Sequence, residues 1–345
     1  MVENLKRIDL INAIEATRES FDTDSPTVPF IEGDGIGIDI WPASKKVFDA
    51  AVEKAYKNDR KIDWIEVLAG QKAFDNTNEW LPDKTLETFN EFGVGIKGPL
   101  TTPVGEGIRS INVAIRQELD LYVCLRPIKY FKGIQTPTKN PQDVDITLFR
   151  ENTEDVYAGK ELENSTGDVE KLNKFLKDEF GWEIRTDSGI GIKPISQTAS
   201  ERLIRASLNY AVENNKKNVA IVHKGNIMKY TEGAFRDWGY ELAVNEFRED
   251  CITERESWIL DNIQKNPEIT IENNARKIEP GFDKLTNNKK AFICEEIKEV
   301  ITSISHSHGD GKWQELILVD DRIADSIFQQ IQTRPQEYSI LATLN

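Results

Sequence analysis

Strand-like and helix-like segments alternate along most of this chain, and this alternation limits its possible folds more than any other feature of the sequence. The stretch "TVPFI" is extended and apolar, and after a glycine-rich turn Val47, Ala51 and Ala55 follow with helical spacing. The segments "WIEVLAG" and "FGVGIKGP" predict two further strands, with a helix, "PDKTLETFNEFG", between them. Because strands that are joined by helices usually pair in parallel, we predict an α/β protein with a largely parallel sheet.

The second half of the chain shows the same alternation. "KPISQTASERLIRASLNYAVENN" predicts a helix, "KNVAIVHK" a strand and "TEGAFRDWGYELAVNEF" another helix, and the chain closes with a strand, a helix and an apolar run. Two regions interrupt the pattern. Residues 160–190 are polar and acidic, which predicts an arm or an insert, and residues 255–312 are charged and poor in apolar side chains, which predicts a peripheral region.

The charge of the chain argues against several classes of partner. With 345 residues it is long enough for two domains, and 59 acidic against 44 basic residues give a net charge of −15, which disfavours nucleic acid and membranes as partners. Three widely spaced cysteines fit neither a disulfide framework nor a zinc site. The acidic N-terminus lacks the apolar region of a signal peptide, and we therefore expect a cytoplasmic protein.

A cationic span, "KGPLTTPVGEGIRSINVAIRQ", stands out in this acidic chain. If "PVGEG" is a turn and "SINVAIRQEL" a helix, Ser110 lies at the N-cap, where free backbone N–H groups and the helix dipole attract anions. Asn112 and Arg116 are four residues apart and share a face of that helix. The alternative is an ordinary capped helix with a solvated arginine.

Two more arginines lie at predicted strand ends, Arg126 in "CLRP", where Pro127 closes the strand, and Arg150 at the end of "VDITLFR". Ligands of open α/β sheets gather where strands end, and guanidinium groups bind carboxylates in a bidentate manner. Salt bridges between domains are the alternative for either arginine.

Tyr157 and Lys224 are candidates for proton transfer. Tyr157 follows the Arg150 strand after a short acidic loop, and Lys224 ends the strand "NVAIVHK", so each is placed where it can face a cleft. A surface lysine is the alternative for Lys224.

The segment "DDRIADSIFQQIQTRP" predicts a helix that carries Asp321 and Asp325 beside or opposite its apolar face. Carboxylate oxygens suit Mg²⁺ or Mn²⁺, but one helix supplies too few of them, and a solvated acidic face is the alternative. The earlier "GDGIG" lacks the spacing of a dinucleotide-binding fingerprint, and we interpret it as a tight turn.

Six blocks in this order closely resemble the NADP-dependent isocitrate dehydrogenases of bacterial type, from about residue 27 to the last residue. They are "IKGPLTTPVGEGIRSINVAIRQ", "LYVCLRP", "LFRENTEDVYAG", "DSGIGIKPISQTASERLIR", "VHKGNIMKYTEGAFRDWGYELA" and "DRIADSIFQQIQTRPQEYSILATLN". The 255–312 region resembles cyanobacterial members. The resemblance implies the isocitrate/isopropylmalate dehydrogenase-like fold, with two α/β domains around a central cleft. It divides the chain into an N-terminal arm (1–26), a large domain (27–121 plus 314–345), a small domain (122–158 plus 194–313) and a clasp or dimerisation insert (159–193).

The resemblance also implies the reaction, oxidative decarboxylation of isocitrate to 2-oxoglutarate with NADP and Mg²⁺ or Mn²⁺, and a homodimer to which Lys224 and Asp325 are lent by the neighbouring subunit. Tyr157 and Lys224 are the implied catalytic residues, and Asp325 is the implied metal ligand. The implied isocitrate-binding residues are Ser110, Asn112, Arg116, Arg126 and Arg150, and those along NADP are Thr101, Asn226, Gln329 and Arg334.

Two departures from the family pattern lead to further expectations. Glu106 stands where the family usually has a glycine, and we expect weaker isocitrate binding from its charge. The chain ends at Asn345, where the family continues, so we expect an incomplete large domain, a compromised metal site, poor NADP affinity and an unpaired apolar edge after "SILATLN". The alternative function is a catalytically impaired isocitrate-binding or regulatory subunit.

Overall fold

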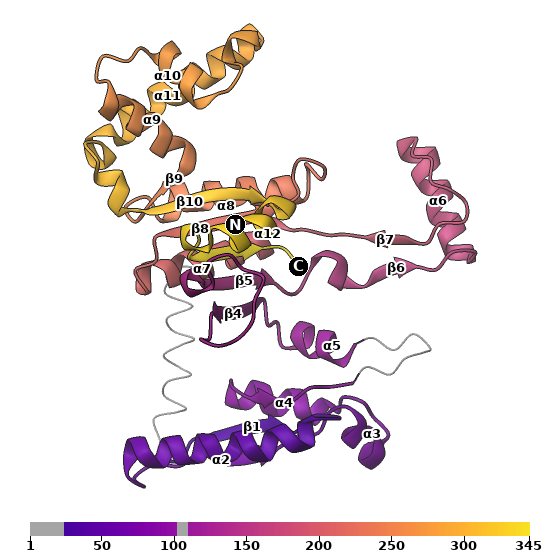
Figure 1. Cartoon of the computed structure of the whole chain (residues 1–345). Coiled ribbons are helices and arrows are strands. Elements are labelled where there is room, and N and C mark those ends of the chain that lie inside the picture. Colours follow the sequence, from indigo (N-terminus) through magenta and orange to yellow (C-terminus); the bar gives the residue numbers. More distant parts are fainter. Residues whose placement is uncertain (1–23, 102–109) are drawn as a thin grey trace. The chain divides into compact units, whose positions relative to one another are not determined.

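The computed structural model describes residues 24–101 and 110–345, which divide after Leu121 into two compact units (Figure 1). The predicted N-terminal arm lies outside the described residues except for residues 24–26, and so does Glu106. Within the described ranges, none of the helices combines the length and the apolar character needed to cross a bilayer.

The first unit contains a three-stranded parallel sheet with the strand order β2–β1–β3. Its strands are β1 (Thr27–Ile31), β2 (Asp63–Glu66) and β3 (Ile96–Lys97), and its helices are α2 (Gly37–Tyr56), α3 (Gln71–Thr77), α4 (Asp83–Phe92) and α5 (Ile111–Glu118). The alternation of strand and helix that the sequence predicts is therefore present in this unit. Its main hydrophobic core contains the buried side chains of Ile31, Val67, Ala69, Phe89, Leu100, Ile111 and Ile115.

The "GDGIG" turn after β1 brings two distant segments together. Gly33 has φ +94°, and a Cβ atom on it would lie 2.5 Å from the Pro99 carbonyl oxygen, so only glycine fits there. The next residue, Asp34, accepts backbone N–H groups from Gln71 and Thr101, each at 2.9 Å. The interpretation of this segment as a tight turn is confirmed, and the turn fixes the position of Thr101.

The second unit contains a six-stranded sheet with the order β4–β5–β11–β8–β10–β9. All neighbouring strands in it are parallel except β4, which runs antiparallel to β5, so the prediction of an α/β protein with a largely parallel sheet is confirmed. The strands are β4 (Val123–Lys129), β5 (Asp145–Glu151), β8 (Asn218–His223), β9 (Cys251–Thr253), β10 (Ile317–Ile323) and β11 (Ile340–Thr343).

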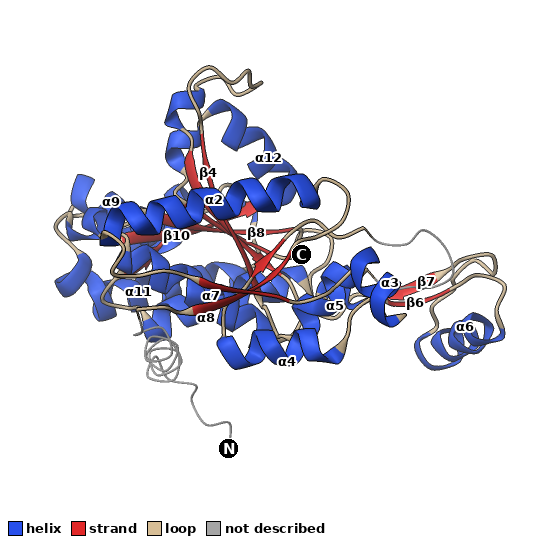
Figure 2. Cartoon of the chain, turned by 90° about the horizontal axis from the view of Figure 1, so that it is seen from below, coloured by secondary structure: helices blue, strands red, loops and turns tan. Residues whose placement is uncertain are grey.

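Helices cover both faces of this sheet. α7 (Gln197–Glu213) and α8 (Glu232–Glu246) lie side by side (Figure 2), and they bury apolar side chains such as Leu203 and Phe235 together with Val219 and Ile221 of β8. α12 (Ala324–Thr333) packs on the other face, where Ile327 joins side chains from the alternate positions of the strands. Strand β8 is buried at every position because both of its faces are covered.

Residues 314–345 differ from the domain division that the sequence predicts. Strands β10 and β11 lie in the six-stranded sheet of the second unit and not with residues 27–121. β11 is also an inner strand, paired with β5 on one side and β8 on the other, so the apolar run "SILATLN" is not a sheet edge. Its apolar side chains favour a doubly covered position, and a strand in the middle of a sheet provides one.

The region around residues 160–190 forms a small arm, as its composition predicts. β6 (Lys160–Leu162) and β7 (Ile190–Ile192) make a two-stranded antiparallel sheet, and α6 (Gly167–Phe180) lies between them in the chain. The arm leads away from the six-stranded sheet (Figure 1). Its role as a dimerisation clasp stays a prediction.

The charged region around residues 255–312 is more ordered than its composition suggests. α9 (Glu254–Lys265), α10 (Ile271–Ile278) and α11 (Asn287–His308) pack together beyond the edge strand β9 and bury a core of their own (Figure 1). The few apolar side chains of each helix are spaced so that they lie on one face, and this face packs into the core. The prediction of a peripheral region is right in its placement, but it missed this second core. Short 3₁₀ turns complete the chain: η1 (Pro141–Asp143), η2 (Asp155–Ala158), η3 (Phe282–Lys284), η4 (Lys312–Glu315) and η5 (Pro335–Glu337).

Candidate functional site

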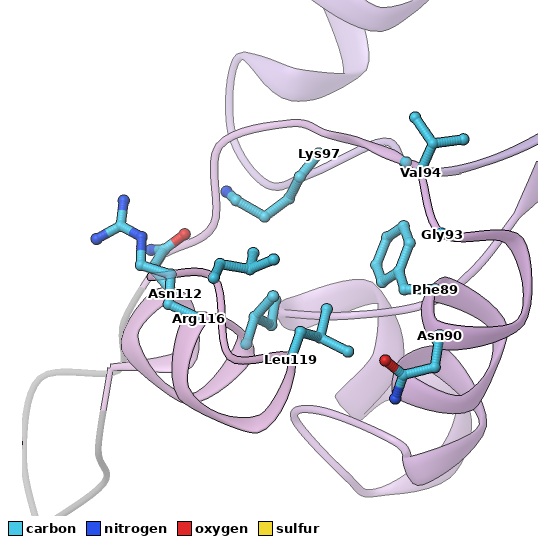
Figure 3. Close-up of a pocket in the computed structure, with 11 residues that line it drawn as sticks. Phe89, Asn90, Gly93, Val94, Lys97, Asn112, Arg116 and Leu119 are labelled. Carbon is cyan, nitrogen blue, oxygen red and sulfur yellow. The ribbon is translucent and has the colours of Figure 1, made fainter. Parts of the chain in front are cut away.

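A pocket of about 490 Å³ lies in the first unit beside α4, β3 and α5 (Figure 3). Its polar lining includes Lys97 from β3 and Asn112 and Arg116 from α5. Its apolar lining comes from Phe89, Val94, Ile115, Leu119 and Leu121. The pocket therefore combines an apolar wall with two cations and an amide, a composition that suits a small anionic ligand.

Burial and a neighbouring positive charge both lower the pKa of Lys97. Partial burial lowers the pKa of the Lys97 ammonium, and the nearby Arg116 guanidinium lowers it further, while Asp34 acts in the opposite direction. Lys97 Nζ donates a hydrogen bond to the Gly98 carbonyl oxygen at 2.7 Å. Because two cations line one pocket, a bound carboxylate would relieve their repulsion.

Helix α5 positions the predicted anion-binding residues of this unit. Ser110 is its N-cap residue, as the sequence predicts, and the Ser110 carbonyl oxygen accepts the N–H groups of Val113 and Ala114 at 2.9 Å. Asn112 and Arg116 both line the pocket, so the structure brings together the pair that the i, i+4 spacing places on one face (Figure 3). Thr101 lies apart from the pocket, exposed beside the "GDGIG" turn.

In the second unit, Arg126 and Arg150 lie on one face of the β4–β5 pair. Arg126 of β4 pairs with Leu148 of β5 across the antiparallel ladder. Arg150 is two positions after Leu148 on β5, so its side chain and that of Arg126 lie on the same face of the two strands. Arg126 is not at a strand end, because β4 continues through Pro127 to Lys129. An edge strand tolerates proline, since one side of it makes no ladder hydrogen bonds.

Tyr157 lies next to Arg150. It belongs to the short turn η2, and the Arg150 guanidinium carbon is 4.9 Å from the centre of the Tyr157 ring. This cation–π contact holds the Tyr157 ring beside the Arg150 guanidinium.

Lys224 and Asp325 form the second pair. Lys224 Nζ is 2.5 and 2.6 Å from the two carboxylate oxygens of Asp325. Lys224 directly follows β8, and Asp325 is in the first turn of α12, which directly follows β10. β8 and β10 are parallel neighbours, so their carboxyl ends bring the two side chains together. The hydrogen bond from Lys224 lowers the pKa of Asp325, whose side chain is 71% exposed.

The two pairs share one edge of the six-stranded sheet. Arg150 of β5 pairs with Thr343 of β11, and Thr343 pairs with Val222 of β8, two residues before Lys224. β5 and β8 are two strand spacings apart, or about 10 Å. The carboxyl ends of parallel strands are the usual place for ligands in such sheets.

The remaining predicted cofactor residues are exposed on the second unit. Asn226 lies in the turn after Lys224. Gln329 is on α12, where its side-chain amide donates to Thr333 Oγ1 at 3.2 Å, and Arg334 pairs with Glu337 at 3.2 Å. Each of these three residues is therefore accessible to a ligand from solvent.

At the carboxyl ends of the parallel strands, the carboxylate of Asp325 is a candidate ligand for a metal ion. The part of the chain that the structure describes contains no group of three His, Cys, Asp or Glu side chains placed to hold a metal. Mg²⁺ often uses only one or two protein carboxylates and takes its other ligands from water and substrate. Asp325 therefore fits as one ligand of such an ion.

Two features of the site escape sequence reasoning. Lys97 is in the quoted cationic span, but its position on the short strand β3 gave no sign of a shared pocket. His223 is buried next to Lys224, and it accepts the Gly225 N–H at Nδ1 (2.9 Å) and contacts Asp321 through Nε2 (2.8 Å). Tyr240 also donates to Asp321 at 2.8 Å. These hydrogen bonds link β8, β10 and α8, and no local sequence pattern reports such a link.

Comparisons with known proteins agree on one family. A family model described as isocitrate/isopropylmalate dehydrogenase matches residues 27–345. Proteins named isocitrate dehydrogenase [NADP] are 59% identical in Nostoc sp., 54% in Synechocystis sp. and 49% in Staphylococcus aureus. Each alignment covers 93% of this chain and 71%, 70% and 68% of the respective relative.

Solved structures give the same result for the fold. The crystal structure of isocitrate dehydrogenase from Methylococcus capsulatus matches with a TM-score of 0.59 and 29% identity. The match covers 92% of this chain and 66% of that one. A Thermus thermophilus protein, at 24% identity and a TM-score of 0.57, shares the fold over 92% of this chain and 45% of its own.

Proposed function

This chain belongs to the isocitrate/isopropylmalate dehydrogenase family, and on that premise we propose that it oxidises and decarboxylates isocitrate to 2-oxoglutarate, with NADP as the oxidant and a divalent metal ion as cofactor. The observation in the molecule that supports this best is the pocket that Lys97, Asn112 and Arg116 line in a chain of net charge −15. Isocitrate carries three carboxylates, so a local cluster of cationic side chains attracts and binds it.

Five residues bind the substrate carboxylates in this proposal, with Lys97 as a further cation. Lys97, Asn112 and Arg116 hold one carboxylate, together with the N-cap residue Ser110 at the N-terminus of α5. Arg126 and Arg150 bind the others from the shared face of β4 and β5. Bidentate guanidinium contacts then orient the substrate as well as bind it.

Tyr157 and Lys224 handle the protons of the reaction. When bound, NADP supplies the hydride acceptor, and the metal ion, Mg²⁺ or Mn²⁺, supplies a Lewis acid at the ketone oxygen. Tyr157 donates the proton that the substrate carbon receives after CO₂ has left, and its cation–π contact with Arg150 holds the ring in place. Lys224 is the second proton-handling group, and its contact with Asp325 holds its ammonium group in place.

The cofactor contacts, the assembly and the compartment complete the proposal. Thr101, Asn226, Gln329 and Arg334 lie along NADP, and Asp325 is one of the metal ligands. The working unit is a homodimer in which Lys224 and Asp325 serve the neighbouring subunit's site, and the arm of residues 159–193 acts as its clasp. The protein works in the cytoplasm, with no nucleic-acid or membrane partner.

The test is NADPH formation, followed by absorbance, with isocitrate and Mg²⁺ or Mn²⁺. The wild-type chain should turn over, and Arg150→Met should lower kcat/KM at least about tenfold, because it removes a charged hydrogen-bond donor worth about 1.5–3 kcal/mol. Arg276→Met, on the exposed surface of the helical insert, is the matched control and should keep wild-type activity. Tight isocitrate binding without turnover by the wild-type chain would instead favour the impaired binding or regulatory subunit.

A further inference from the structure

A half-buried lysine connects the turn that carries Tyr157 with the turn that carries Lys224. Lys193 contacts Asp155 Oδ1 and, at 3.1 Å, Glu232 Oε1. The Asp155 side chain is 1% exposed, that of Glu232 is 11% exposed, and that of Lys193 is 22% exposed. The three groups therefore form an ion-pair chain that is largely shielded from water.

One end of this chain fixes the η2 turn. Asp155 has φ +66°, a conformation that a residue with a side chain rarely adopts, and two local contacts hold it there. Its N–H donates to the Pro194 carbonyl oxygen at 2.9 Å, and its Oδ1 accepts the Val156 N–H at 2.6 Å. Because Tyr157 is two residues further on in the same turn, the position of Asp155 determines that of Tyr157.

The other end fixes the turn after β8. Glu232 is the first residue of α8, and its Oε2 accepts the backbone N–H of Lys224. Its other carboxylate oxygen, Oε1, is the one that contacts Lys193. A single carboxylate thus joins the backbone at Lys224 to the ammonium group of Lys193.

We propose that Lys193 is a positioning residue, which holds Tyr157 and Lys224 in their reactive positions through Asp155 and Glu232. This inference rests on the proposed function, because that function assigns the proton transfers to Tyr157 and Lys224. Lys193 contacts both of these buried carboxylates, and without its charge their repulsion pushes both turns away from the present geometry. If Lys224 serves the neighbouring subunit, the same lysine holds parts of two active sites of a homodimer.

Amide hydrogen exchange tests the positioning directly and does not depend on activity. In Lys193→Met, the N–H groups of Val156 and Lys224 should both exchange faster than in the wild type, although 67 positions separate them in the sequence. Lys216→Met is the matched control: its side chain is 21% exposed in the same unit and is 3.7 Å from Asp145. Unchanged exchange at Val156 and Lys224 in Lys193→Met would overturn the proposal.

The kinetic test separates positioning from general stability. Lys193→Met should lower kcat about 10- to 100-fold, with a smaller change in KM, because small displacements of reacting groups have effects of this size. In the Tyr157→Phe background the same substitution should have a smaller effect on kcat, since one of the two groups that it positions is already lost, and in the Tyr157→Phe/Lys224→Met background it should have almost none. Equal fold losses in all three backgrounds would show that Lys193 acts only on stability, and would refute the proposal.

Companion variants keep the test decisive if Lys193→Met does not fold. Glu232→Gln should speed exchange at Val156, and Asp155→Asn should speed it at Lys224, each through Lys193. Effects confined to the substituted turn would contradict the link. An inactive wild type whose exchange follows these expectations would remove the proposed function and leave the link between the turns intact.

Discussion

The stability of the second unit should depend on pH through Asp320, a buried carboxyl on β10. Asp320 is 2% exposed, and its Oδ2 is 2.8 Å from the Arg322 guanidinium. Burial raises the pKa of Asp320 to about 7, and the negative charges of Glu254 and Asp321 add to this effect. Arg322 offsets only part of it, because Arg322 also binds Glu254 at 3.0 Å.

The sign and the size follow from proton linkage. In the folded protein Asp320 holds its proton up to about pH 7, whereas in the unfolded chain it loses the proton near its ordinary value of 3.8. The folded state therefore binds more protons between these values, and the stability that this contributes at low pH is lost as the pH rises through 7. Linkage gives a loss of about 2.5 kcal/mol in the free energy of unfolding between pH 5 and pH 8.

Urea unfolding of the wild type and Asp320→Asn at pH 5, 6, 7 and 8 measures this loss. The difference between the two proteins removes the contributions of all other titrating groups, since both proteins share them. The stability of the wild type relative to Asp320→Asn should fall by about 2.5 kcal/mol from pH 5 to pH 8. Asp145→Asn, at an exposed position of β5, controls for the loss of one carboxylate. A relative stability that stays constant to within about 0.5 kcal/mol over this range would refute the reasoning.

Three further predictions concern the first unit and the helical insert. Lys97→Met should raise the KM for isocitrate about tenfold or more in a steady-state assay, since it removes one of the two pocket cations, whereas Lys45→Met, on the outside of α2, should not. Gly33→Ala should raise the KM for NADP, because its Cβ would lie 2.5 Å from the Pro99 oxygen and displace the turn that holds Thr101. Gly167→Ala, at a position with nothing within 4 Å of the added Cβ, is the control, and equal KM values for the two variants would contradict this role of the turn. Ile297→Ala should lower the free energy of unfolding of the core of α9, α10 and α11 by about 2–5 kcal/mol. We expect faster amide exchange in these helices and little change in β8. Loss of protection throughout the six-stranded sheet would show that the insert has no core of its own.

The fold class was predictable because its signals are local. Apolar periodicity indicated the strands of both sheets and helices such as α7. The turn "GDGIG" and the helix N-cap at Ser110 could be placed from residue type alone. The spacing of Asn112 and Arg116 likewise placed both on one helix face, and both line one pocket. Such features depend on residues within a few positions of one another, so the sequence contains all that is needed to infer them.

Strand order was less predictable, because it depends on which distant segments compete for the same partner. The run "SILATLN" has the composition of a buried strand, but its place between β5 and β8 follows from two ladders with segments more than 100 residues away. The same limit applies to Pro127, which looks like a strand end until β4 is known to be an edge strand. Assigning residues 314–345 to the wrong domain has this cause.

The sequence by itself determined the α/β class, the family and the residue types at the site, because short motifs in a fixed order carry that information. Only the tertiary structure decided which of these residues meet: Lys97 with Arg116, Arg150 with Tyr157, Lys224 with Asp325, and Lys193 with Asp155 and Glu232. The physical reason is that charges act over a few ångströms of space. Parallel strands bring together ends that are far apart in the chain, and no residue in the sequence specifies that distance.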